Sequence, residues 1–430
     1  MIYLNDITLH TSASLGEKYY EIRHRSGLRI FVVPKNFSTC YGIIGTKFGS
    51  VDDKFKLDGK EVSLPIGTAH FLEHKLFESE DGISADERFA ALGAETNAYT
   101  AYTSTRYLFS ATKNYGKCIA ELLRFVTHPY FTEENVEKER GIIEQEIMMY
   151  ADDPYDKVME NCLRAMYRYN GIRNNICGSP ESLKEITPDV LYSAYGTFYN
   201  LNNMTLSVCG DITPDEIIKI ADRELPFESE PFNFVKIPSK PEGDGVWKDY
   251  SEKRMRVARP LFFIGIKDKT VEEGPARTRR SFAMTVLNNM LFSGTGEFYN
   301  RLLNERLITP GFSFGYSSGG AAMNYFSGNS DEPEKVYSEI LKKAESAADG
   351  DLDMADFVRC KRSSIASFFK SFDSSAEIAD DVILSSVLSG VEPFSVREMI
   401  DSLTFDEIKS IAAEIFGDKK NRALSLVLPL

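Results

Sequence analysis

Residues 66–79 read IGTAHFLEHKLFES, and the interpretation of the whole chain starts from this stretch. It is predicted to form a helix. In a helix His70 and His74 lie one turn apart on the same face, so both imidazoles can reach one ion. Glu73 lies on the flank of that face, about 60° from His70, where its carboxylate can contact a water on the ion without ligating it. The stretch therefore predicts a metal site with an acid beside it.

The order H-x-x-E-H is the inverse of the H-E-x-x-H zinc peptidase motif. Because the chain has only five histidines, a chance pair with this spacing and this Glu is expected roughly 0.004 times. Two neutral imidazoles plus a carboxylate suit zinc and leave a fourth position for water. We therefore predict Zn²⁺, one ion per chain, although manganese and cobalt use similar ligands. The alternative is a pair of hydrogen-bonded histidines on a half-buried helix.

A catalytic zinc needs a third protein ligand, which should be a distant carboxylate. The predicted helix over 132–151 offers several. On a helical wheel Glu139 and Glu146 fall within the apolar sector, whereas Glu137 and Glu144 fall on the solvent side. A carboxylate on an apolar face is unfavourable unless it is paired, hydrogen-bonded or bound to metal. Glu139 and Glu146 are thus the candidates, with an internal salt bridge as the alternative.

These two motifs together resemble the pitrilysin/insulinase family of zinc metallopeptidases. The matching residues are His70-Phe-Leu-Glu73-His74 and, later, Glu139-Arg-Gly-Ile-Ile-Glu-Gln-Glu146. The resemblance implies that His70, His74 and Glu146 bind the zinc. It also implies that Glu73 is the general base for peptide hydrolysis and that Glu139 is a supporting acid in the catalytic site.

A further match concerns the strand predicted over 94–100. Asn97, Ala98 and Tyr99 look like the family's strand beside the active site. The resemblance implies that an extended peptide substrate adds to this sheet edge through main-chain hydrogen bonds. For Asn97 the alternative is an ordinary residue at the end of a strand. The resemblance is strong over residues 20–225 and weaker over 240–430.

The chain length resembles the processing-peptidase branch of the family, and HFLEHKLFE and QEIMMYADDP look most like its bacterial YmfH type. The branch implies a homo- or heterodimer with a related chain, closing on short or unfolded peptides. Family members also grip substrate with an Arg and a Tyr of the second domain. Here Asn304 replaces that Arg, and Arg301, Arg306 and Tyr316 are the candidate substitutes. This departure leaves a second hypothesis, a zinc-binding but non-proteolytic partner subunit of a peptidase-like complex or a protein-modification pathway.

Composition limits the other classes of function. The 430 residues are 43% apolar and 27% charged, which is typical of a globular protein of two to four domains. A net charge of -14 disfavours general binding to nucleic acid or to anionic membranes. The chain shows no run of 18 apolar residues and no secretory leader, so we expect a cytoplasmic protein without a membrane span. Its six scattered cysteines contain no C-x-x-C pair, and they are predicted to be core or surface thiols outside any Cys-type zinc site.

The two halves of the chain end alike. Phe198 precedes Leu206-Ser-Val by eight residues, and Phe416 precedes Leu424-Ser-Leu by the same eight. We therefore predict an α+β fold with internal duplication, in which two homologous α/β-sandwich domains each carry an antiparallel-rich sheet covered by helices. The predicted domains are 1–228, which is catalytic and binds zinc, and 251–430, which is zinc-free because no histidine follows His128, with a linker over 229–250. His10 and His24 are predicted to lie on the surface or in a hairpin.

Overall fold

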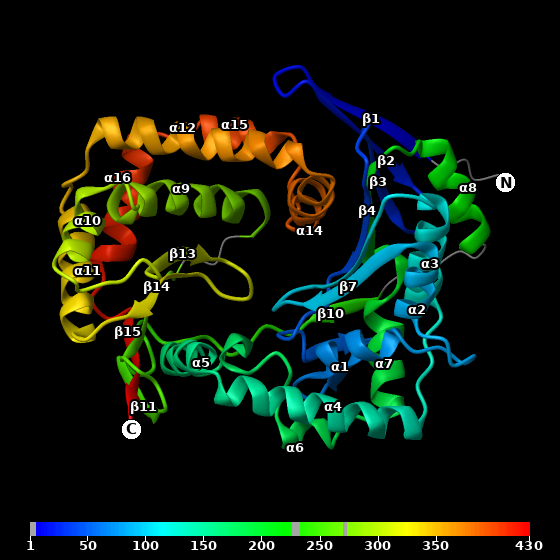
Figure 1. Cartoon of the computed structure of the whole chain (residues 1–430), viewed down its shortest axis with the longest axis horizontal. Coiled ribbons are helices and arrows are strands. Elements are labelled where there is room, and N and C mark those ends of the chain that lie inside the picture. The colour runs from blue at the N-terminus through cyan, green and yellow to red at the C-terminus, as the bar shows by residue number, and fades with distance from the viewer. Residues whose placement is uncertain (1–5, 226–232, 270–272) are drawn as a thin grey trace. The chain divides into compact units, whose positions relative to one another are not determined.

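The computed structural model describes residues 6–225, 233–269 and 273–430 (Figure 1). Within these residues the chain forms two compact units. The first takes Met1–Ile147, Ile176–Pro238 and Phe369–Phe394, and the second takes Met148–Asn175, Ser239–Phe368 and Ser395–Leu430. Each unit therefore includes a segment from the other half of the sequence.

The first unit is built on a seven-stranded sheet of order β1-β2-β3-β9-β4-β8-β7. Its strands are β1 (Asp6–Ser12), β2 (Glu17–Arg23), β3 (Arg29–Pro34), β4 (Cys40–Thr46), β7 (Ala94–Thr100), β8 (Thr105–Ala111) and β9 (Met204–Gly210). Only β3 and β9 pair in parallel, and β9 is buried along its whole length. Strand β7 lies at the edge, where its outer main-chain groups can accept another strand.

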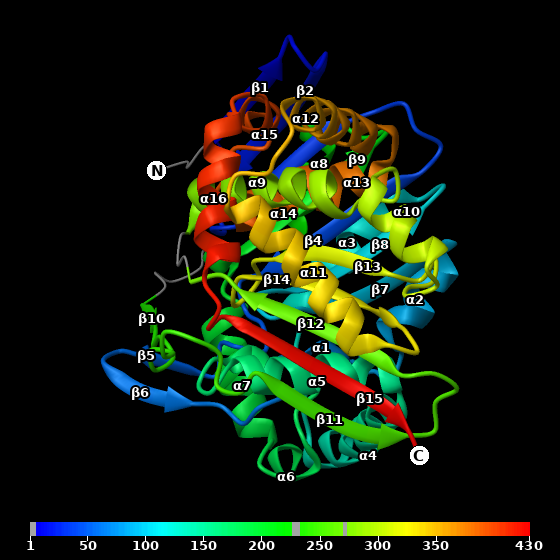
Figure 2. The same ribbon diagram turned by 90° about the vertical axis from the view of Figure 1, so that its left-hand side faces the viewer.

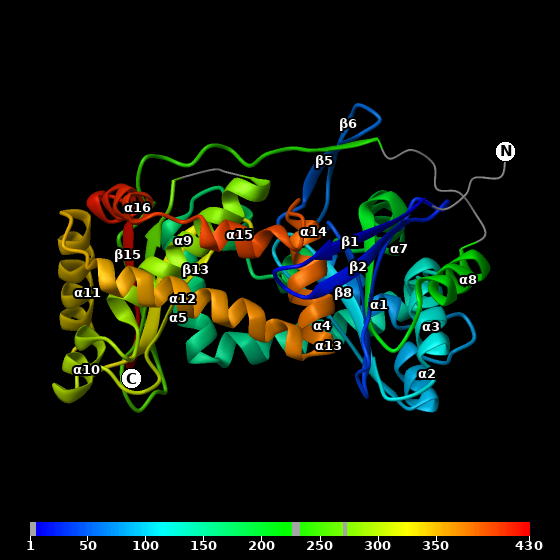
Figure 3. The same ribbon diagram turned by 90° about the horizontal axis from the view of Figure 1, so that it is seen from above.

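Alternation along β8 sends successive side chains to opposite faces of this sheet. Tyr107 packs against Phe125, with ring centroids 5.5 Å apart, on the face covered by helices. Arg106 points the other way and pairs with Asp380. Figure 3 shows α13 and α14 beside the strands on that second face. The helical elements of the unit are α1 (Thr68–Leu76), α2 (Ala85–Leu92), α3 (Tyr115–Thr127), α4 (Glu133–Asp152, continuing into the second unit), α6 (Pro180–Leu183), α7 (Pro188–Phe198), α8 (Pro214–Glu224), α13 (Ser375–Glu377), the π-helix η4 (Ile378–Leu384), α14 (Ser385–Leu388) and the 3-10 turns η2 (Leu201–Asn203) and η3 (Ser371–Asp373).

The second unit holds a five-stranded sheet of order β11-β15-β12-β14-β13 (Figure 2). Its elements are β11 (Tyr250–Met255), β12 (Leu261–Lys267), β13 (Ser313–Ser317), β14 (Met323–Asn329), β15 (Arg422–Pro429), α5 (Pro154–Met166), η1 (Gly171–Arg173), α9 (Gly274–Phe292), α10 (Glu297–Asn304), α11 (Pro333–Ala348), α12 (Met354–Lys370), α15 (Ser395–Asp401) and α16 (Phe405–Gly417). Helix α5 packs on β12 and β15. A Cβ at Gly265 would stand 2.1 Å from the sulfur of Met166, so the glycine allows this close packing.

The two sheets share one topology. Strands β3-β9-β4-β8-β7 and β11-β15-β12-β14-β13 follow each other in the same order. In the first sheet β9 pairs in parallel with β3 and antiparallel with β4. In the second sheet β15 pairs in the same way with β11 and β12. The predicted α+β fold with two related, helix-covered sheets is therefore confirmed. The domain boundaries predicted at 228 and 251 stay a prediction, and residues 229–232 of the predicted linker lie outside the described residues.

Some features differ from the sequence-based expectation. Strand β1 and the small sheet of β5 (Lys54–Leu57), β6 (Lys60–Ser63) and β10 (Phe234–Lys236) were not expected, and β10 falls inside the predicted linker. These strands are largely exposed, so they carry little apolar patterning. His24 lies in the hairpin between β2 and β3, one of the two places expected for it, and its side chain is buried with 3% of the residue's surface exposed. Among the helices described, none is both long enough and apolar enough to cross a membrane.

Candidate metal centre

Helix α1 carries the two histidines and packs against the first unit's sheet. It begins after Gly67, whose φ of 97° is left-handed and favours glycine. The rings of His70 and His74 lie 4.6 Å apart between centroids, as expected for one face of a helix. Burial lowers the pKa of His70 to about 3, and the nearby His74 contributes to that shift. His70 is therefore a neutral imidazole, which is the form that ligates metals.

Glu146 comes to these histidines from α4. Its Oε2 lies 3.7 Å from Nε2 of His70 and 3.7 Å from Nε2 of His74. That oxygen is buried and accepts no hydrogen bond from the described residues. Nitrogen and oxygen ligands of a tetrahedral zinc stand roughly 3.4 Å apart, given bonds of about 2.0–2.1 Å. A buried acceptor without a hydrogen-bond partner, at nearly that separation from two imidazoles, fits a cation in its neighbourhood.

Glu139 lies one step behind, on the other side of His74. Its Oε1 accepts a hydrogen bond from Nδ1 of His74 at 2.9 Å, and Lys75 stands 3.8 Å from Oε2. Burial acts to raise the pKa of Glu139, but the hydrogen bond and charge of His74 outweigh it and hold that pKa below its ordinary value. The same pair raises the pKa of His74 despite burial. The bond directs Nε2 of His74 toward Glu146, which is how supporting partners usually orient a metal-binding histidine.

Glu73 is buried, with 8% exposed, and is held by a neighbour that sequence reasoning missed. Its Oε2 accepts a hydrogen bond from Oγ1 of Thr100 at 2.5 Å. Burial raises the pKa of Glu73, and the bond from Thr100 opposes that rise. Thr100 ends strand β7, so its contact with Glu73 depends on how the strand crosses α1. No spacing within the sequence reports such a crossing.

The predicted substrate-binding residues lie on the same strand, but the structure does not bring all their side chains to the histidines. Alternation places Ala98 on the face of Thr100, and Asn97 and Tyr99 on the opposite face. Tyr99 donates a hydrogen bond to Asp380 at 2.8 Å. The Oδ1 of Asn97 accepts from the amide of Ala98 at 2.9 Å. Their part in substrate binding stays a prediction that rests on the main chain of the edge strand.

Two of the candidate grip residues are engaged within the second unit. The hydroxyl of Tyr316 donates to Oδ2 of Asp268 at 2.7 Å. Arg301 donates to Glu339 at 2.7 Å and also faces Glu305. Because both side chains already have partners, substrate contact would require these bonds to break.

Cys177 also reaches His70, although the sequence placed no cysteine at this site. The ligand atoms of His70, Glu146 and Cys177 all lie within 4.8 Å of one another. The Sγ of Cys177 is 3.8 Å from Nε2 of His70. Since Cys177 follows His70 by 107 residues, only the folded chain brings the two together.

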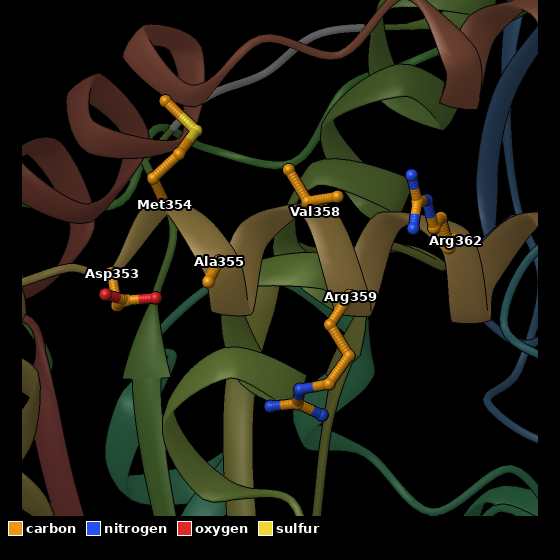
Figure 4. Close-up of a pocket in the computed structure, with 6 residues that line it drawn as sticks. All are labelled: Asp353, Met354, Ala355, Val358, Arg359 and Arg362. Carbon is orange, nitrogen blue, oxygen red and sulfur yellow. The ribbon is translucent and has the colours of Figure 1, made fainter.

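A separate pocket of about 680 Å³ lies along α12 in the second unit. Figure 4 shows its lining side chains, which include Met354 and Val358 beside Arg359 and Arg362. All of its lining residues come from one helix and the residue before it. It contains no histidine or cysteine, so it offers no comparable set of metal ligands.

Comparisons with known proteins point to one family. Residues 60–179 match the model described as Insulinase (Peptidase family M16), and residues 185–364 match the Peptidase M16 inactive domain. The chain is 33% identical to an uncharacterized zinc protease of Bacillus subtilis, YmfH, over 93% of this chain and 94% of the relative. It is 23% identical to the Caenorhabditis elegans mitochondrial-processing peptidase subunit beta, over 81% and 78%. A solved M16-like peptidase from Alicyclobacillus acidocaldarius superposes with a TM-score of 0.93 and 31% identity, covering 98% of this chain and 100% of that one.

Proposed function

Because this chain belongs to the insulinase (M16) family of peptidases, we propose that it is a zinc-dependent endopeptidase acting on short or unfolded peptides. The observation that supports this most is the meeting of two imidazoles and the buried Oε2 of Glu146 beside an independent acid, Glu73. A purely structural zinc has no use for that acid. His70, His74 and Glu146 would hold the ion, with Glu139 positioning His74.

Zinc, when bound, would polarise the scissile carbonyl and acidify a water molecule. The chain's own residues carry out the proton transfers. The carboxylate of Glu73 accepts the proton of the attacking water and returns it to the leaving amine. Burial raises the pKa of Glu73 above its ordinary value, so its carboxylate is a stronger proton acceptor than an exposed one.

Thr100 positions Glu73 by donating to Oε2, so that the other oxygen stays available to the water. The substrate would lie along the outer edge of β7 as an added strand near Asn97, Ala98 and Tyr99. Main-chain hydrogen bonds of this kind hold a peptide in place with little dependence on its sequence.

The test is cleavage of a pool of quenched fluorescent peptides by the full-length protein. We expect turnover in the presence of zinc, its loss after treatment with phenanthroline, and its return when zinc is restored. A protein that binds zinc stoichiometrically and cleaves no peptide in the pool would contradict the proposal.

The second candidate function is a zinc-binding, non-proteolytic partner subunit. The specific observation in its favour is that Tyr316 and Arg301 are engaged with acidic partners. Stoichiometric zinc together with absent turnover would select this alternative. Assembly with a related chain and a cytoplasmic location stay predictions in either case, and the size of the purified particle tests the first of them.

A further inference from the structure

The thiol of Cys177 lies at a distance from His70 that suits two ligands of one metal ion. Its Sγ is 3.8 Å from Nε2 of His70, and the ligand atoms of His70, Glu146 and Cys177 lie within 4.8 Å of one another. A tetrahedral zinc with bonds of about 2.3 Å to sulfur and about 2.0 Å to nitrogen would set these two atoms roughly 3.5 Å apart. The observed separation is therefore close to that of a shared ion.

A buried oxygen of Glu146 beside Cys177 also fits a cation at this place. Oε2 of Glu146 is buried and accepts no hydrogen bond from the described residues. His70 is 8% exposed, and its Nε2 faces the Sγ of Cys177. A thiol, an imidazole and a carboxylate in one largely buried cluster form a set that readily binds a zinc-like ion.

The backbone around Cys177 lies in close contact with the start of α1. Gly67 and Gly178 have φ values of 97° and 86°. A Cβ at Gly67 would come within 2.6 Å of the carbonyl oxygen of Cys177, and a Cβ at Gly178 within 2.5 Å of that of Ile66. Ser182 adds a hydrogen bond from its hydroxyl to the carbonyl of Ile66 at 2.7 Å. The backbone of the segment that carries Cys177 is therefore packed closely against the turn that starts the histidine helix.

We propose that Cys177 is a fourth protein ligand of the metal centre and that its thiolate closes the site. This inference rests on the proposed function, because it presupposes the zinc held by His70, His74 and Glu146. When the thiol coordinates, it gives its proton to solvent, and the sulfur takes the coordination position that a catalytic site must leave open. Peptide hydrolysis then requires Cys177 to leave the ion, so the thiol restrains the peptidase.

Zinc K-edge X-ray absorption of the full-length, zinc-loaded protein tests the ligand directly. We expect one sulfur at about 2.3 Å in the wild type. That sulfur should be lost in Cys177→Ala and Cys177→Ser and kept in Cys118→Ala, which removes another buried thiol of the same unit. A shell of only nitrogen and oxygen in the wild type, or a sulfur that persists in Cys177→Ala, would overturn the proposal.

Turnover separates this inference from the proposed function. Peptide cleavage by Cys177→Ala should rise several-fold over the wild type, and an unchanged or lower rate would overturn the closing role. Zinc bound through nitrogen and oxygen alone, with active cleavage, would refute the thiolate ligand and leave the peptidase intact. Failure of the wild type to bind zinc at all would refute both. Thermal unfolding of each variant checks that the cysteine change has not simply unfolded the protein.

Discussion

Glu144 and Glu146 are two residues apart on α4, yet only Glu146 contacts the histidines. The helical wheel separates them because 200° of rotation sends their side chains to opposite sides of the helix. The structure places Oε2 of Glu146 at 3.7 Å from both imidazoles. At the scale of single residues, the metal centre therefore depends on which acid of this helix faces inward.

Replacing Glu146 with Ala should remove a metal ligand and lower zinc affinity by on the order of 100-fold or more, given that even supporting partners contribute about 10- to 100-fold. Metal analysis after dialysis against a weak chelator measures the loss. The matched control is Glu144→Ala, which should keep its zinc. Equal loss of zinc in both variants would show that Glu146 is not the metal-binding carboxylate of α4.

His24 provides a pH-dependent prediction away from the metal centre. Burial lowers the pKa of His24 below the value of an unfolded histidine, although Asp222 at 3.2 Å opposes this. As pH falls below about 6.5, the unfolded chain takes up a proton that the folded chain resists, so the free energy of unfolding decreases. Chemical denaturation at pH 7.5 and pH 5.5 should show a smaller loss of stability in His24→Gln than in the wild type. An identical loss in both would exclude His24 as a cause.

The sequence predicted part of this site and missed the rest for a physical reason. His70, His74 and Glu73 lie within one short helix, so their spacing alone indicates two ligands of one ion with an acid beside them. Thr100 and Cys177 reach the same cluster only through the path of the folded chain, which no local pattern reports.

At the scale of elements, the proposed metal centre relies on the contact between α1 and the loop before α6. Gly67 allows this contact because it has a left-handed φ and no side chain facing Cys177. Helices α3 (115–127) and α7 (188–198) bury side chains that recur at helical spacing along the sequence. The exposed strands β1 and β6 escaped prediction because few of their residues are buried.

Gly67→Ala should lower the free energy of unfolding by about 2–4 kcal/mol, from roughly 1–2 kcal/mol of left-handed strain plus overpacking. It should also weaken zinc binding, because it pushes the loop away from the histidine helix. Gly82→Ala is the matched control, since Gly82 has a φ of 75° but no atom within 4 Å of its added Cβ. Urea denaturation of both variants measures the difference. A loss no larger than that of Gly82→Ala would mean that the contact does not matter.

At the scale of the whole molecule, the notable feature is the exchange of segments between the two units. Residues 369–394 belong to the first unit, and residues 148–175 to the second. Leu384 lies close enough to β4 that a Cβ at Gly45 would stand 3.3 Å from it. Such contacts join residues hundreds of positions apart. A domain division at residues 228 and 251 follows the order of the sequence, so it separates residues that lie in contact.

A fragment of residues 1–228 should therefore fold poorly. It lacks Ile378 and Leu384, which are fully buried against the first sheet, and it carries α5 without the sheet that α5 covers. We expect dye binding to exposed apolar surface and a broad thermal transition for the fragment, compared with cooperative unfolding of the full chain. A sharp transition near that of the full chain would support the predicted boundary. It would also show that the first unit folds without residues 369–394.

The most direct test of the central claim is the turnover of Glu73→Gln measured alongside its zinc content. A glutamine keeps the size of the side chain and can still accept the hydrogen bond from Thr100, but it cannot take a proton from water. We expect full zinc occupancy and a fall in kcat/KM of about 10²- to 10⁴-fold. Cleavage near the wild-type rate with zinc in place would contradict it, because the acid beside the imidazoles would then play no part in the reaction.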